Sequence, residues 1–204
     1  MRRLIRERNR FVKCGVRFDN TNKDEATFWT LMSDKAHVAQ ASGVSEWFTP
    51  VIYIDAAREV MGSIEIDPAS TETGNKVVQA STYFTAKDDG RTKEWRGNVW
   101  MNPPYSQPLV GEFCDLFVEK YRGREIEQGC VLVNNATETG FFQNMLQKAQ
   151  AACFVKGRVG FLDEHGKPGA PLQGQIVLYF GKNYEKFAEV FSKFGVVWYA
   201  KRKD

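Results

Sequence analysis

From about residue 46 onward, short apolar runs of strand length alternate with longer stretches that carry apolar residues at helical spacing. Such an alternation is typical of α/β proteins, in which helices flank a mainly parallel sheet, and the chain therefore predicts a domain of this class. The helix at residues 50–61 is expected to begin with Thr49 as its N-cap and to end at Gly62. The predicted strands cover residues 63–67, 97–101, 129–134, 152–155 and 175–180, and the further predicted helices cover residues 108–121, 137–149 and 183–194.

The first 45 residues differ in composition from the rest and predict a basic N-terminal extension, which the folded domain follows at 46–204. Residues 1–13 hold six arginines and lysines but a single acid, Glu7, and residues 24–41 carry a helical pattern. Near the other end Lys201-Arg202-Lys203 is again basic, although the formal net charge of the chain is only +3. Basic ends of this kind either neutralise the phosphates of a nucleic acid or only keep the chain soluble, and both interpretations stay open.

Composition and residue spacing exclude several classes of protein. With 43% hydrophobic and 26% charged residues, the chain is expected to fold as a soluble globular protein. No apolar run approaches the ~20 residues that span a bilayer. The start of the chain also lacks the apolar core of a signal peptide, so a cytoplasmic location without membrane contact is expected. Neither a disulfide framework nor a metal site is expected from the widely spaced cysteines and histidines, which are Cys14, Cys114, Cys130, Cys153, His37 and His165.

The most informative motif is Asn102-Pro103-Pro104-Tyr105, which directly follows the predicted strand at 97–101. Two consecutive prolines have a fixed φ and no N–H group, so the strand must end there in a stiff loop. Ligands of such sheets bind beyond the carboxyl ends of the strands. The sequence therefore predicts that an amide side chain, backbone carbonyls and an aromatic ring are presented at a ligand-binding edge.

These groups suit the methylation of an exocyclic amino group. The lone pair of such a nitrogen is delocalised into its ring, so the group is a poor nucleophile. Two acceptors for its hydrogens would favour the pyramidal nitrogen of the transition state. The side-chain oxygen of Asn102 and the carbonyl of Pro103 can serve as these acceptors. Tyr105 can stack on the ring that carries the amino group, such as an adenine. This chemistry needs neither a metal ion nor a covalent intermediate.

The motif resembles the [D/N/S]-P-P-[Y/F/W] loop of amino methyltransferases, and its surroundings resemble the phage-type DNA N6-adenine methyltransferases (the phage Dam-like family). The resemblance extends from about residue 46 to 198, roughly three quarters of the chain. It implies a Rossmann-like fold that depends on S-adenosyl-L-methionine, and methyl transfer to an adenine flipped out of double-stranded DNA. It also implies a phage or prophage protein in a bacterial cytoplasm. The segments that carry the resemblance are Glu46-Trp47-Phe48-Thr49-Pro50, Ile66-Asp67-Pro68-Ala69-Ser70, Tyr83-Phe84-Thr85, Asp88-Asp89-Gly90, Trp95 and Val99-Trp100-Met101-Asn102-Pro103-Pro104-Tyr105.

The resemblance also implies roles for individual residues. Thr49 and Pro50 would lie against the methionine end of the cofactor, Asp67 would bind its amino group, and Asp88 or Asp89 would bind its adenine amine. The catalytic loop would consist of Asn102, Pro103, Pro104 and Tyr105. The full set of expected cofactor-binding residues is Trp47, Thr49, Pro50, Asp67, Pro68, Ala69, Ser70, Asp88 and Asp89.

One feature departs from the family pattern. Many of these enzymes have a glycine-rich turn after the acid of the first strand, whereas here Gly74 is the first glycine after Asp67. Ser70 and Thr71 are the candidates for the contacts of that turn. Simpler interpretations also stand for the acids, because Asp67 could be a helix N-cap and Asp88-Asp89-Gly90 could be only a turn.

Other functions stay open at this point. A methyltransferase that acts on an RNA base or a protein glutamine would use a similar loop, and a catalytically silent module that binds DNA or the cofactor could keep the fold. The segment at 163–175 is either a surface loop or a loop that reads DNA. Target recognition is expected from the N-terminal extension, from the region after Asn134, or from a second subunit. The recognition sequence and the oligomeric state are left open.

Overall fold

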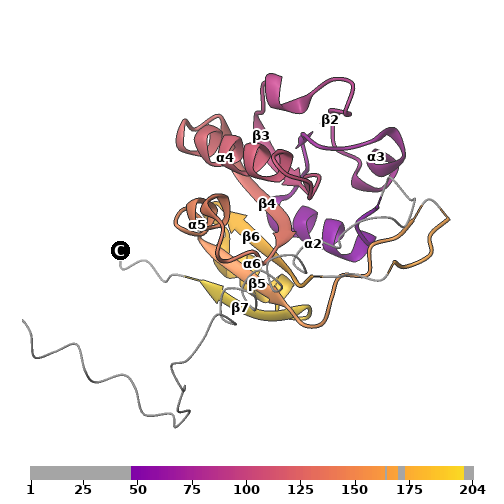
Figure 1. The fold of residues 1–204 in the computed structure, drawn as a ribbon. Helices are drawn as coiled ribbons and strands as arrows, with labels where there is room; N and C mark the ends of the chain where they lie inside the picture. The colour runs from indigo at the N-terminus through magenta and orange to yellow at the C-terminus, as the bar shows by residue number, and fades with distance from the viewer. Residues whose placement is uncertain (1–46, 164, 170–172, 200–204) are drawn as a thin grey trace, which may run out of the picture. The chain divides into compact units, whose positions relative to one another are not determined.

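Seven strands form one sheet in the order β2-β1-β3-β4-β6-β5-β7 (Figure 1). The computed structural model describes residues 47–163, 165–169 and 173–199, all within the unit Gly43–Asp204. The predicted helix at 24–41 and the basic segments at both ends lie outside these residues. The strands are β1 (Ile66–Asp67), β2 (Thr82–Tyr83), β3 (Gly97–Met101), β4 (Ile126–Asn134), β5 (Ala151–Val155), β6 (Gln175–Phe180) and β7 (Gly195–Tyr199).

The strand directions divide the sheet into two halves. In the first half, β2, β1, β3 and β4 pair in parallel. In the second half, β6 runs antiparallel between β4 and β5, and β7 runs antiparallel to β5. Strands β1 to β5 therefore point the same way, and the predicted α/β class with a mainly parallel sheet is confirmed. The short strand β2 and the edge strand β7 are additions to the predicted set.

Helices cover both faces of the sheet. Helices α2 (Val51–Met61) and α6 (Tyr184–Phe191) pack on one face, whereas α4 (Leu109–Arg122) and α5 (Gly140–Leu146) pack on the other (Figure 1). The predicted helices correspond to these four. A fifth helix, α3 (Glu72–Val78), is not among the predicted elements. None of the helices in the described part of the chain is long and apolar enough to cross a membrane.

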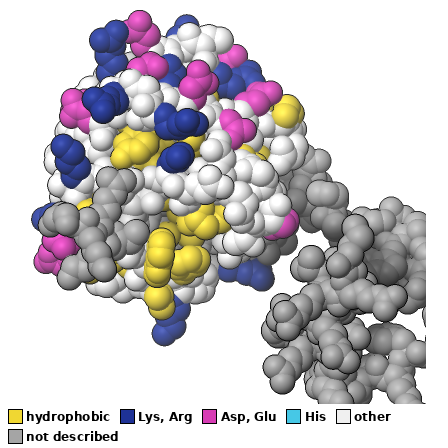
Figure 2. Space-filling view, turned by 90° about the vertical axis from the view of Figure 1, so that its left-hand side faces the viewer, with side chains coloured by type: hydrophobic (Ala, Val, Ile, Leu, Met, Phe, Trp, Pro, Cys, Tyr) yellow, Lys and Arg dark blue, Asp and Glu magenta, His cyan; other side chains and the backbone are white. Residues whose placement is uncertain are grey.

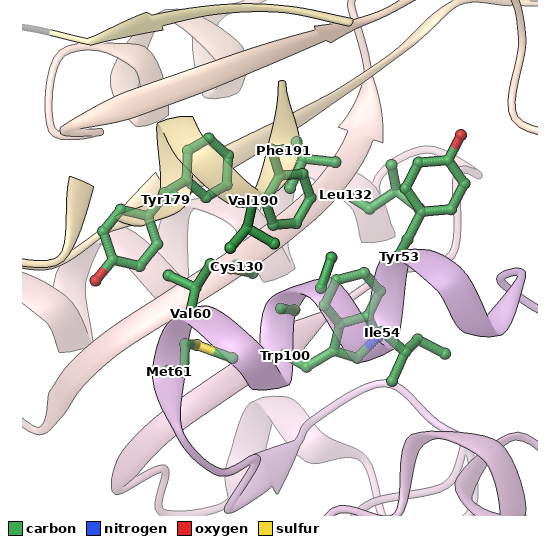
Figure 3. Packing of buried hydrophobic residues seen from close by; sticks show 14 of the residues in the cluster. Tyr53, Ile54, Val60, Met61, Trp100, Cys130, Leu132, Tyr179, Val190 and Phe191 are labelled. Carbon is green, nitrogen blue, oxygen red and sulfur yellow. The ribbon is translucent and has the colours of Figure 1, made fainter. Parts of the chain in front are cut away.

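Alternate residues of β3 join the core on opposite faces of the sheet, as the period of a strand requires. Val99 and Met101 pack with α4 and α5, while Trp100 packs with α2. Figure 3 shows the Trp100 ring against α2 beside Ile54. Trp100 is only 1% exposed, and burial of a side chain of this size stabilises the fold by about 2–3 kcal/mol. This contact fixes α2 against the strand that leads into the Asn-Pro-Pro-Tyr loop.

The start of α2 differs from the expectation. Pro50 occupies the N-cap position with φ −56° and ψ 134°, and no side chain caps the helix. The fixed φ of proline suits this position, because it is compatible with the conformation of a cap residue. At the other end, Gly62 adopts φ 87° and its N–H donates to the Arg58 carbonyl over 2.7 Å, as predicted for a C-terminal glycine. Thr49 is therefore not the N-cap, and its hydroxyl has another partner.

Candidate active site

Three segments meet at the carboxyl edge of the parallel half of the sheet: the loop after β1, the loop after β3, and the segment that precedes α2. Strands β1 and β3 are parallel neighbours with Ile66 opposite Val99, so both strands end at this edge. The segment before α2 joins them because the Asn102 side-chain amide donates to the Thr49 hydroxyl over 3.1 Å. Residues that are far apart in the chain thus form one site.

The Asn102 side chain is held at both ends of its amide. Its Nδ2 donates to Thr49 Oγ1, and its Oδ1 accepts a hydrogen bond of 2.9 Å from the Tyr105 hydroxyl. An amide oxygen has two lone pairs, so Oδ1 can accept a second hydrogen bond from a ligand. The side chain is half-buried, which leaves it within reach of a bound molecule. The loop after β3 therefore presents an oriented acceptor.

Tyr105 supports this loop from the side of the core. Its half-buried ring packs on the cluster beneath α4 and meets Phe161 edge-on, with the ring centroids 6.0 Å apart. Burial raises the pKa of the Tyr105 phenol, so the hydroxyl keeps its proton at neutral pH and acts as a donor. Within the same loop Pro103 is buried and Pro104 is exposed. The loop is thus anchored at Pro103 and Tyr105.

Asp67 lies at the end of β1 and is only 3% exposed. Burial raises the pKa of its carboxyl to about 6, although the Ser70 side chain and the Ala69 amide donate hydrogen bonds to it. It does not cap a helix, because α3 starts five residues later with Thr71 as its N-cap, whose hydroxyl accepts from the Gly74 amide over 2.9 Å. A buried carboxylate at a strand end is a group that a cationic ligand would stabilise.

Asp88 and Asp89 lie in the turn that follows β2. Because β2 is the parallel neighbour of β1, with Tyr83 opposite Asp67, this turn is at the same edge of the sheet. The Asp88 carboxylate accepts hydrogen bonds from the Thr85 amide and hydroxyl, which lower its pKa. The Asp89 carboxylate forms a two-pronged pair with the Arg91 guanidinium, which lowers its pKa as well. Both acids therefore stabilise the turn.

The sequence of residues 36–195 matches the family model described as DNA N-6-adenine-methyltransferase (Dam). The chain belongs to this family. The match covers more than three quarters of the 204 residues and includes all three segments that form the site. It confirms the family that the Asn-Pro-Pro-Tyr loop and its flanking segments indicate. No curated protein matches the sequence.

In this Dam-family chain, the segment after β5 also reaches the site, and it does so through Phe161, a residue that the sequence analysis did not single out. Phe48 and Leu162 exchange two backbone hydrogen bonds of 2.8 and 2.9 Å, and the Trp47 ring lies against Gly169. Phe161, which precedes Leu162, contacts the Tyr105 ring. Nothing in the local sequence marks Phe161, because a single aromatic residue in a loop carries no periodic signal.

Gln175 is a second residue at this edge that the sequence analysis did not single out. It begins β6, is 5% exposed, and forms hydrogen bonds with both ends of its amide. Its Nε2 donates to Asn134 Oδ1 over 3.1 Å, and its Oε1 accepts from the Val159 amide over 3.0 Å. Gln175 thereby ties the segment after β5 to the end of β4. The signal available in the sequence was a polar residue at the start of an otherwise apolar run.

The polar groups of the site are of the kind that bind organic ligands. Within residues 47–163, 165–169 and 173–199, no group of three or more His, Cys, Asp or Glu side chains could hold a metal ion. Cys114, Cys130 and Cys153 are buried and unpaired, and burial raises the pKa of each thiol. The described site is lined by amide, hydroxyl, carboxylate and aromatic groups.

Proposed function

We propose that this Dam-family chain transfers a methyl group from S-adenosyl-L-methionine to the N6 amino group of an adenine flipped out of double-stranded DNA. The observation that carries the proposal is the Asn102 amide, which is held between Thr49 and Tyr105 at the end of β3. Its acceptor oxygen lies at the edge of the sheet where the neighbouring strand ends in the buried Asp67. Asn102 would accept from the amino group of the adenine, and Asp67 would bind the cationic amino group of the cofactor. The same edge of the sheet therefore suits both reactants.

The residues of the loop would assist the adenine nitrogen. S-adenosyl-L-methionine, when bound, supplies a methyl group that is activated by a sulfonium sulfur. Asn102 Oδ1 and the Pro103 carbonyl would accept hydrogen bonds from the two N–H groups of adenine, which would stabilise the positive charge that develops on nitrogen as the N–C bond forms and the sulfur–methyl bond breaks. The nitrogen then releases one proton to water. Tyr105 holds the base in place by ring contact.

The residues at the carboxyl ends of β1 and β2 fit the cofactor in their chemistry. The buried carboxylate of Asp67 suits the cationic amino group of the methionine part, because a neighbouring positive charge would favour the ionised form. Ser70 is buried beside it and takes the place of the glycine-rich turn, since the Thr71 hydroxyl already caps α3. Asp88 has the more exposed of the two turn carboxylates and is the candidate for the adenine amine.

Double-stranded DNA would approach the carboxyl edge, and the target base must leave the stack because its amino group cannot be reached inside the duplex. Exposed basic side chains on the segment after β5 are candidates for phosphate contacts. These are Lys156, Arg158 and Lys167. By contrast, Figure 2 shows the side with α4 and α5, where lysines, arginines and acids are interspersed with hydrophobic side chains. The described residues on that side form no extended basic surface.

The proposal is tested by the transfer of labelled methyl from S-adenosyl-L-methionine to unmethylated duplex DNA, followed by digestion to nucleosides. We expect the label on N6-methyladenine, and we expect it to be lost with Asn102→Ala. Label on a different base would show that the substrate assignment is wrong. The absence of label in DNA, with cofactor still bound, would overturn the proposal and direct the assay to RNA and protein acceptors.

A further inference from the structure

Thr49 lies just before the N-cap residue of α2, and its hydroxyl has a partner outside that helix. The residue is 8% exposed, and α2 begins without a side-chain cap. A threonine at the N-cap position commonly accepts a hydrogen bond from the first turn of the helix, but Pro50 occupies that position in α2. Here the hydroxyl instead accepts from Nδ2 of Asn102, 53 positions further along the chain. The Thr49 side chain is therefore directed to the loop after β3.

In this arrangement the nitrogen of the Asn102 amide is used by Thr49, and the oxygen is the atom available to a ligand. With Nδ2 directed to Thr49, the oxygen lies on the side of the Tyr105 hydroxyl, which occupies one of its two lone pairs. An amide rotated by half a turn would present its NH2 group instead. The amino group of a base would then meet a second donor and would lose an acceptor that its transition state needs.

Both partners of this hydrogen bond are held in place by independent contacts. On the Thr49 side, Phe48 is paired with Leu162 by two backbone hydrogen bonds, and Pro50 has a restricted backbone. On the Asn102 side, Trp100 is buried in β3 against α2 beside Ile54 (Figure 3). The helix that follows Thr49 is thus packed on the strand that leads to Asn102. A hydrogen bond between two supported groups needs little reorganisation when a substrate binds.

We infer that Thr49 is a positioning residue, which keeps the Asn102 amide oxygen directed to the amino group that is methylated. The inference rests on the proposed function and assigns Thr49 a task other than the cofactor contact that the family resemblance implies. It acts through Asn102 and does not touch the reacting atoms. Its hydroxyl should therefore affect the rate of methyl transfer and leave cofactor affinity unchanged.

The test compares Thr49→Val, which keeps the shape but removes the hydroxyl, with Thr49→Ser, which retains it. At saturating cofactor and DNA we expect kcat of Thr49→Val to fall about tenfold, as for the loss of one hydrogen bond, and kcat of Thr49→Ser to stay near wild type. The calorimetric Kd for S-adenosyl-L-methionine should be the same in all three proteins. A raised Kd with an unchanged kcat would overturn the inference and assign Thr49 to the cofactor.

A second readout does not depend on methyl transfer. In the full chain labelled with ¹⁵N-asparagine, the Asn102 side-chain signals are identified by their loss in Asn102→Asp. We expect these signals to shift, and their protons to exchange several-fold faster, in Thr49→Val but not in Thr49→Ser. Unchanged signals in Thr49→Val, or in Thr49→Ala if the valine variant does not fold, would overturn the inference. If the wild type methylates no DNA, the proposed function fails while this measurement still tests the hydrogen bond.

Discussion

The Tyr105 hydroxyl donates to Oδ1 of Asn102 over 2.9 Å, so the first and last residues of the Asn-Pro-Pro-Tyr loop are joined by their side chains. The two prolines between them restrict the backbone, and this hydrogen bond closes the loop on itself. Tyr105 therefore has two separable contributions. Its ring can contact the base, and its hydroxyl steadies the acceptor.

Tyr105→Phe keeps the ring and removes only the hydroxyl. We expect kcat to fall by about three- to tenfold, as for the loss of one neutral hydrogen bond, while DNA affinity is retained. Tyr121→Phe is a matched control. It removes a hydroxyl that donates a hydrogen bond of 2.9 Å to Gln150 and that takes no part in the loop. Steady-state methyl transfer by the three proteins provides the comparison. Equal kcat in all three would show that the Tyr105 hydroxyl is not needed.

Asn102→Ala removes the proposed acceptor. We expect folding and cofactor binding to be nearly unchanged and the barrier to methyl transfer to rise by about 2–4 kcal/mol, as for the loss of one transition-state contact. Asn144→Ala serves as the control, because Asn144 donates to Asp115 on the surface of α4. Single-turnover rates measure the chemical step directly. Wild-type rates in Asn102→Ala would contradict the proposed role.

Asp67→Asn should change the pH dependence of stability. Burial raises the pKa of the Asp67 carboxyl from 3.8 to about 6 in the folded protein. At pH values between these two, the folded state therefore holds a proton that the unfolded state has released. Wild-type stability therefore decreases as the pH rises from about 4 to about 7. This decrease is about 3 kcal/mol and is absent from the variant.

Urea unfolding of both proteins between pH 4 and pH 8 tests this prediction. The free energy of unfolding of Asp67→Asn should increase relative to wild type across this window and then remain level. The exposed Asp55 on α2 offers Asp55→Asn as a control that removes a carboxylate from the surface. Parallel pH profiles for wild type and Asp67→Asn would show that the Asp67 carboxyl titrates at its ordinary pKa.

Asp67→Ala should weaken the binding of S-adenosyl-L-methionine, because the proposed partner of the cationic amino group is lost. A hydrogen bond to a charged group contributes about 1.5–3 kcal/mol, so Kd should rise by roughly 10- to 100-fold. Isothermal titration calorimetry measures this directly, with Asp55→Ala as the control variant. An unchanged Kd would refute the assignment of Asp67 to the cofactor.

Deletion of residues 1–13 tests whether the basic start of the chain contacts DNA. Each phosphate contact contributes about 0.9 to the slope of log K against log salt concentration. If some of the six basic residues bind phosphate, the truncated chain should have a shallower slope. Fluorescence anisotropy with a labelled duplex at several salt concentrations measures both slopes. Identical slopes would mean that the segment only affects solubility.

Much of the fold could be predicted because its signals are local. The apolar run at 97–101 and the proline pair after it specify a strand and its end without help from distant residues. The helix at 108–121 was predicted within one residue at each end. The missed elements are short or weakly patterned. Strand β2 has two residues, and β7 has no polar residue although Val196 and Trp198 are exposed, so neither shows an alternation of apolar and polar residues in the sequence.

The sequence by itself determined the family and the candidate catalytic loop, because Asn102, Pro103, Pro104 and Tyr105 are adjacent and their chemistry can be read together. Only the tertiary structure decided what surrounds that loop. The pairing of Thr49 with Asn102 depends on how α2 packs on Trp100, and the contact of Phe161 with Tyr105 depends on the path of the segment after β5. Such contacts join residues that are distant in the chain. They arise from the packing of whole elements, which no local pattern of residues specifies.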